Sequence, residues 1–246
     1  MKKILLSIVF VFLIGSLLAY VVMRRPDGKF AVVELFTSEG CSSCPPADKL
    51  LGQLNKDLGS QHVYVLSFHV DYWDKYGWKD KFSNPQFTSR QMAYDKTLHT
   101  DTYTPQAVVN GTKEALGSDK NALMQFINSM LHTTDNGKNL KCDLTINGGK
   151  LQVAYQADPS QTGDNINVAL VQDNASDQVT AGENKGVEIQ HFNVVREFKT
   201  EKLKNTAGDI TLDIPEDMKA GKLHVIAYVQ NRKNLQISSA ISADTN

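Results

Sequence analysis

The chain has 246 residues, of which 41% are hydrophobic and 22% are charged, which is the composition of an ordinary globular protein. Its 26 basic and 27 acidic residues give a formal net charge of -1 at pH 7. Such a balance provides no overall field that would recruit nucleic acid, and we therefore expect no nucleic-acid partner.

The first 25 residues have the pattern of a membrane signal. Two lysines precede an uncharged, largely apolar stretch over residues 4–23, and two arginines follow it. About 20 apolar residues are enough to cross a bilayer as a helix, and the stretch lacks a clear small-residue cleavage site. We expect an uncleaved signal-anchor helix at residues 1–25, with a cleaved signal peptide as the alternative. The rest of the chain would face the periplasm or the extracellular side, membrane-anchored in the first case and secreted in the second.

Strand and helix patterns alternate after the leader. Residues 30–36 form a β-rich, largely apolar run, typical of a buried strand, and residues 37–40 lead from it to the segment 41–44 with its two cysteines. Leucines at helical spacing predict a helix over residues 47–58, and residues 63–70 predict a second buried strand. This order indicates a βαβ unit with parallel strands.

The second half of the chain has a different pattern. Short alternating runs are separated by clusters of Gly, Asn, Asp and Pro, which is typical of antiparallel strands. We therefore expect one domain over residues 29–132 and an all-β, sandwich-like domain over residues 138–246, with a polar linker between them. The other elements expected in the first half are helices at residues 86–98 and 118–131 and a short strand at residues 107–109.

Cys41 and Cys44 enclose two serines and lie between a predicted buried strand and a predicted helix. Thiol–disulfide exchange favours this position, because backbone amides at a helix start stabilise the thiolate, which is the attacking form. In this interpretation Cys41 attacks and Cys44 resolves the mixed disulfide. Cys142 is left over, and its place in a strand-like run indicates a small buried side chain rather than a third redox thiol.

Residues 33–48, VELFTSEGCSSCPPAD, resemble the signature of the Domain of Unknown Function 1223 family, whose members are secreted proteins with a thioredoxin-like fold. The further blocks that resemble the family are residues 68–74, 77–80, 89–91, 103–106, 182–184, His191 and 193–196. The resemblance covers nearly the whole chain after the leader. It implies a thioredoxin-like α/β domain, followed by the all-β domain, and it leaves the activity open.

The resemblance also implies a role for Thr104 and Pro105. They correspond to the cis-proline turn that faces the CxxC pair in thioredoxin-like proteins, whereas the sequence alone says only that an X-Pro bond makes the cis form accessible. Pro105 would shape the approach of the substrate and keep metal away from the two sulfurs. Thr104 would present its backbone to an extended substrate segment.

Two features weaken the expected reactivity of the cysteine pair. Pro45 and Pro46 follow Cys44, and a helix that began at Cys41 would lose amide donors there, so the helix is expected to begin near Cys44 with Pro45 at its first position. Cys41 would then gain less from the helix dipole. Glu39 would also oppose formation of a thiolate nearby.

Four more residues are candidates for supporting roles because the carboxyl ends of parallel strands share one sheet edge. His69 lies at the carboxyl end of the second predicted strand, and Asp71, Trp73 and Arg90 come after it in the chain. His69 could act as a proton shuttle or as a third metal ligand beside the cysteines. The alternative is that His69 and Asp71 hold an aromatic loop in place.

The leading hypothesis is a thiol–disulfide oxidoreductase that acts on protein thiols or disulfides and needs no cofactor. One alternative is a copper-delivery protein that binds the metal through Cys41, Cys44 and His69. Another is an interaction module with a static disulfide, in which the β-rich half binds the partner. A structural zinc site is not expected, because the second half of a zinc-finger cysteine pattern is missing.

Overall fold

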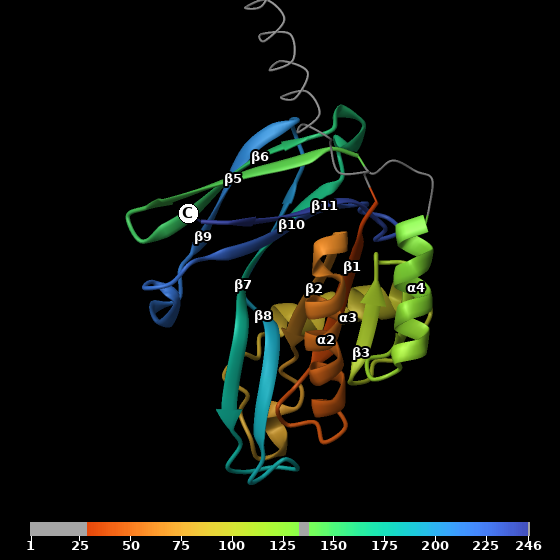
Figure 1. The fold of residues 1–246 in the computed structure, drawn as a ribbon, viewed down its shortest axis with the longest axis vertical. Helices are drawn as coiled ribbons and strands as arrows, with labels where there is room; N and C mark the ends of the chain where they lie inside the picture. Colours follow the sequence, from red (N-terminus) through yellow and green to blue (C-terminus); the bar gives the residue numbers. More distant parts are fainter. Residues whose placement is uncertain (1–28, 133–137, 246) are drawn as a thin grey trace, which may run out of the picture.

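The computed structural model of the protein describes residues 29–132 and 138–245 (Figure 1). The elements before the gap are β1 (Ala31–Thr37), α2 (Pro45–Leu58), β2 (Val63–His69), α3 (Pro85–Leu98), β3 (Gln106–Val109), β4 (Lys113–Leu116) and α4 (Lys120–His132). Those after it are β5 (Leu140–Asn147), β6 (Lys150–Ala157), β7 (Asn165–Gln178), β8 (Glu188–Lys202), β9 (Ala207–Asp213), β10 (His224–Gln230) and β11 (Ile237–Asp244). The helices and strands predicted from hydrophobic periodicity therefore form close to the predicted positions.

Strands from both halves of the chain form one continuous sheet. The eight strands are ordered β11-β10-β7-β8-β2-β1-β3-β4, and β5-β6-β9 form a second sheet of three strands. β2 is parallel both to β1 and to β8, while the other neighbours are antiparallel. The junction between the halves is the pair β2–β8, where Ser67 is aligned with Val194.

The expected thioredoxin-like α/β domain followed by a separate all-β sandwich is wrong. The described chain is mostly β, and an eight-stranded mixed sheet runs through both of the expected units. The physical reason is the second edge of β2, which exposes unpaired backbone groups unless another strand covers it. β8 supplies that strand, so the β-rich half extends the first sheet instead of closing a sandwich of its own.

Two further expectations are left without a test by this architecture. The domain boundaries at residues 29–132 and 138–246 stay a prediction. The expected leader at residues 1–25 lies outside the described residues. Within the described residues, none of the helices combines the length and the apolar character needed to cross a membrane.

The side chains of alternate residues in β1 pack into two different cores, on opposite faces of the large sheet. Val33 and Leu35 pack with α2 and α4 on one face, whereas Val32 and Phe36 pack with α3 on the other. A third core lies between the three-stranded sheet and strands β7 and β10. The end of the large sheet where β1 and β2 both finish is thereby held rigidly between helices.

An ion pair is buried in the core under α3. Glu34 on β1 accepts hydrogen bonds from Arg90 Nε at 2.6 Å and from Arg90 Nη2 at 2.8 Å. Tyr94 donates its hydroxyl to the same carboxylate at 2.9 Å. The guanidinium also lies over aromatic rings, with its carbon 4.9 Å from the centroid of Phe198 and 5.6 Å from that of Tyr228. Arg90 therefore fixes α3 to the sheet.

We expect Arg90→Met to lower the free energy of unfolding by about 3–5 kcal/mol, because it leaves the Glu34 carboxylate buried without its cation. Urea denaturation of the full-length protein measures the change. The double variant Glu34→Leu/Arg90→Met removes both charges and should lose less than Arg90→Met alone. A double variant that is less stable than the single one would contradict this account.

Candidate functional site

A disulfide between Cys41 and Cys44 closes the turn between β1 and α2. Cys44 directly precedes the helix and Pro45 is its first residue, so the helix begins where the proline pair predicts. The exposed fraction is 1% for Cys41 and 0% for Cys44, whereas Ser42 and Ser43 are exposed. The two serines are therefore accessible to solvent, whereas the two cysteines are not.

The turn that joins β7 to β8 covers the cysteine turn. The Asn184 side-chain amide donates hydrogen bonds to the backbone carbonyls of Glu39 and Cys41, each at 2.9 Å. The neighbouring Glu183 carboxylate accepts a hydrogen bond from the backbone N–H of Ser42 at 3.3 Å. Because Asn184 is itself buried, these bonds hold the backbone around Cys41 in place.

The Thr104–Pro105 segment lies beside the same turn, and its peptide bond is cis, as the family resemblance implies. The Ser43 hydroxyl donates to the carbonyl of Thr104 at 3.5 Å, and the Trp73 indole N–H donates to the Thr104 hydroxyl at 2.8 Å. Trp73 also packs closely against Gly40, where an added β-carbon would lie 3.2 Å from Trp73 Cβ. Thr104 and Trp73 are thus neighbours of the cysteine turn, and their roles stay predictions.

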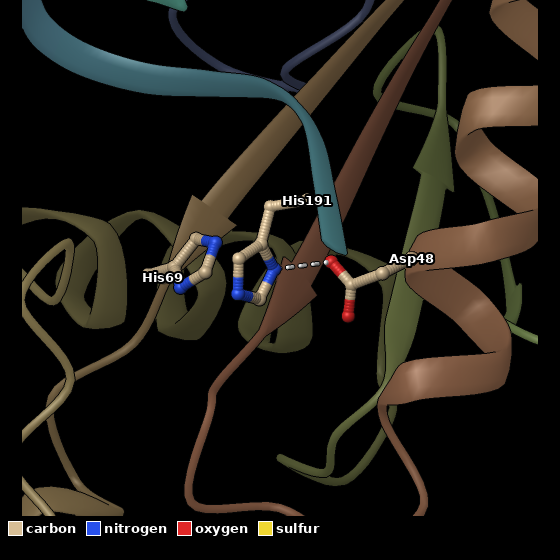
Figure 2. Close-up of side chains that lie close together, drawn as sticks. All are labelled: Asp48, His69 and His191. Atoms are coloured by element: carbon tan, nitrogen blue, oxygen red, sulfur yellow. Dashed lines mark hydrogen bonds and ion pairs between the residues drawn. The ribbon is translucent and has the colours of Figure 1, made fainter. Parts of the chain in front are cut away.

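Five polar side chains lie buried at this end of the sheet, and we call them the imidazole cluster: Glu39, Asp48, His69, Asp80 and His191. Nδ1 of His191 lies 3.3 Å from Asp48 Oδ1, and its Nε2 lies 3.3 Å from Glu39 Oε1. Nδ1 of His69 lies 2.6 Å from Asp80 Oδ2. The two imidazole rings meet edge to face with their centroids 4.7 Å apart. Figure 2 shows Asp48 on α2 facing His191, with His69 on the other side of that ring.

The carboxylates of the imidazole cluster determine its charge. Burial alone would lower the pKa of His191, but hydrogen bonds and charges from Asp48 and Glu39 outweigh burial and raise this pKa to about 9. Burial would raise the pKa of Asp80, but the charge and hydrogen bond of His69 and two backbone amides lower it overall. His191 is therefore an imidazolium at neutral pH unless another cation takes its place.

The metal set Cys41, Cys44 and His69 expected for copper delivery is not supported. The two sulfurs are bonded to each other, and Nδ1 of His69 is engaged by Asp80. In the described part of the chain, a group of possible ligand atoms is instead offered by Asp48, His69 and His191, whose atoms all lie within 4.8 Å of one another.

The remaining candidates lie elsewhere. Asp71 accepts a hydrogen bond from the Thr88 hydroxyl at 2.5 Å and so ties its loop to α3. Arg90 binds Glu34 in the core under α3 rather than joining the cysteine turn. Cys142 is partly buried, and burial, followed by the charge of Asp143, raises its pKa to about 12, so this side chain remains a thiol at neutral pH.

Several residues of the site were visible in the sequence but received no functional role. Asp48 and Asp80 belong to the family-like blocks, and Glu183, Asn184 and His191 to blocks of the β-rich half. They come together because β2 pairs with β8. These strands are far apart in the sequence, so local sequence patterns do not predict the pairing. A family-like block far from the cysteines was the only signal that could have linked His191 to them.

The sequence profile of the DUF1223 family, described as proteins of unknown function, matches residues 32–230. The chain belongs to this family. No curated protein matches it significantly. A crystal structure of a protein from Agrobacterium tumefaciens is similar, with 25% identity and a TM-score of 0.62 over 86% of this chain and 92% of the other. Wild-type OgpA from Akkermansia muciniphila is 13% identical, with a TM-score of 0.23 over 55% of this chain and 40% of its own, and that likeness carries no argument.

For this DUF1223 protein we expect Asn184→Ala to speed the reduction of the Cys41–Cys44 disulfide by dithiothreitol. The substitution removes two buried hydrogen bonds that hold the backbone over Cys41, and each such loss costs about 1–3 kcal/mol. The rate is measured by quenching with an alkylating reagent and mass spectrometry. Lys185→Ala is a matched control, since Lys185 is an exposed residue of the same turn. Equal rates for wild type and Asn184→Ala would show that the turn does not restrict access.

Proposed function

We propose that the Cys41–Cys44 pair carries out thiol–disulfide exchange with protein thiols or disulfides, on the periplasmic or extracellular side of a membrane. The observation that carries the proposal is the disulfide itself, placed between the end of a buried strand and the first turn of α2. The shortest loops gain least stability from closure by a disulfide. A purely structural role therefore explains this pair poorly.

In the oxidising direction, a substrate thiolate attacks Cys41 Sγ, the bond between Cys41 and Cys44 breaks, and Cys44 leaves as a thiolate. A second substrate thiolate then attacks the substrate sulfur of the mixed disulfide and releases Cys41. The substrate loses two electrons and forms a disulfide. The pair gains these electrons and, with the two protons given up by the substrate thiols, becomes a dithiol. The reducing direction is the reverse of these steps.

One feature of the surroundings of Cys44 favours its departure as a thiolate. It lies at the N-cap of α2, where the helix dipole stabilises negative charge, while Pro45 and Pro46 supply no amide N–H to its sulfur. The carboxylates of Asp48 and Glu39 would oppose this charge, but both face His191. Glu39 Oε2 also accepts a hydrogen bond from the Trp78 indole at 2.7 Å. The expected penalty from Glu39 is therefore partly offset.

A protein substrate has an aromatic surface available beside the cysteine turn. Tyr76 is 58% exposed, and its ring meets that of Trp73 edge to face, with the centroids 5.5 Å apart. Trp73 in turn contacts Thr104, whose carbonyl lies next to Ser43. Aromatic side chains with one exposed face suit the binding of a peptide segment. Since the sulfurs are buried, the β7–β8 turn has to move before exchange.

The proposal predicts that Cys44→Ser accumulates mixed disulfides through Cys41, because the resolving sulfur is missing. The full-length variant is expressed in its native host, and its adducts are separated on non-reducing gels and identified by mass spectrometry. Cys41→Ser/Cys44→Ser is the matched control and should form none. Removing Cys142 as well, by Cys142→Ser, should leave the adducts of Cys44→Ser unchanged.

Insulin reduction by the purified full-length protein provides the second readout. Wild type should turn over in the presence of a dithiol, and Cys41→Ser should not. Equal turnover by these two proteins, together with an absence of adducts from Cys44→Ser, would identify the disulfide as a static structural element.

A further inference from the structure

Three side chains from separate parts of the fold converge in the imidazole cluster. Asp48 comes from the first turn of α2, His69 from the last position of β2, and His191 from β8 (Figure 2). Each is at most 1% exposed. The convergence is therefore built by the core of the protein and does not depend on a mobile surface loop.

His69 has a nitrogen that lacks a partner. Its Nδ1 is bound to Asp80, and its Nε2 is buried with no hydrogen-bond partner among the described residues. If the ring is neutral with the proton on Nδ1, the lone pair of Nε2 is unused. If the ring is an imidazolium, the Nε2 proton is unused. A buried polar atom without a partner is costly, and a metal ion would satisfy the neutral form.

The contact between Asp80 and His69 is of the kind that usually orients a metal-binding histidine. Ligating histidines commonly donate their second ring N–H to a carboxylate, which fixes the tautomer and the orientation of the ring. The carboxylate of Asp80 is itself fixed by backbone N–H groups of Glu39 and Phe82, at 2.9 and 2.8 Å. His191 also has a carboxylate next to each ring nitrogen. Its Nδ1 lies 3.3 Å from Asp48 and its Nε2 lies 3.3 Å from Glu39, so a carboxylate faces the second nitrogen when the first one binds a metal.

The charge of the imidazole cluster also calls for a cation. Glu39, Asp48 and Asp80 are three buried carboxylates. The ion pairs found in the described residues give these carboxylates only histidines as partners, and no lysine or arginine. Oε1 of Glu39 has no partner there other than Nε2 of His191 at 3.3 Å, a contact outside hydrogen-bond geometry.

We propose that Asp48, His69 and His191 form a binding site for a divalent transition-metal ion of the zinc type. Two imidazoles and one carboxylate are a common protein ligand set for zinc, with one further position left open. In a tetrahedral site, zinc–nitrogen bonds of about 2.0–2.1 Å place ligand atoms roughly 3.4 Å apart. The ligand atoms here lie within 4.8 Å of one another, so side-chain shifts on the order of 1 Å close the set. The site shares only His69 with the rejected cysteine set and needs no reduced sulfur.

The test is zinc binding by the full-length protein in detergent. The protein is unfolded with a chelator, freed of it, and refolded in a zinc buffer, because a buried site is best loaded during folding. Metal content after gel filtration is measured by mass spectrometry, and affinity by competition with a chromophoric chelator. We expect one zinc per chain, and at least tenfold weaker binding by His69→Asn and by His191→Asn.

Two controls separate this site from other zinc binding. His224→Asn removes a comparable histidine–carboxylate contact, 2.7 Å from Asp173, at a partly exposed position, and should bind zinc as wild type does. Cys41→Ser/Cys44→Ser should also bind as wild type does. Visible absorption of the cobalt(II)-loaded wild type reports the ligand set without any substitution, and it should show nitrogen and oxygen ligands without a thiolate charge-transfer band.

Three results would overturn the proposal. They are refolded wild type without stoichiometric zinc, unchanged affinity in both folded histidine variants, and loss of zinc on removal of the two cysteines. Circular dichroism establishes whether the histidine variants fold. If they do not, the cobalt spectrum of wild type decides, and a thiolate band or the absence of a bound-cobalt spectrum counts against the site.

Discussion

The parallel pairing of β8 with the edge of β2 is the contact on which the rest of the structure depends. It joins the two halves of the chain into one sheet at Ser67 and Val194. It also places His191 and the turn with Asn184 at the end of the sheet where the cysteines lie. Without this pairing the cysteine turn would have neither its cover nor the buried side chain of His191.

Close packing between helix and strand makes this pairing specific. α2 lies directly against β8, and a β-carbon at Gly52 would approach the ring of Phe192 to 2.6 Å. Asn193 adopts a positive φ of 50° and donates its side-chain amide to the carbonyl of Val65 at 3.0 Å. A glycine in a helix interior costs about 1 kcal/mol relative to alanine. Here that cost is offset by the approach of β8 that the missing side chain permits.

Local features of this protein could be read from its sequence, and long-range ones could not. The start of α2 at Pro45 could be predicted because proline has a fixed φ and no N–H, which suits it to the first position of a helix. The buried strands β1 and β2 follow from largely apolar runs. The partner of a sheet edge, by contrast, is determined by packing among distant residues, so the alternating pattern of the second half predicts a sandwich and does not reveal the shared sheet. The contact of Arg90 with Glu34 could not be read from the sequence for the same reason, since the two residues lie on elements far apart in the chain.

The junction between β2 and β8 has a consequence for the order in which the chain folds. Ser67 and Val194 are far apart in sequence, and contacts between distant residues are made late because a long loop must close first. During synthesis, β1, α2 and β2 can assemble before β8 exists. The cysteine pair is then uncovered, and it becomes enclosed only when the last third of the chain docks.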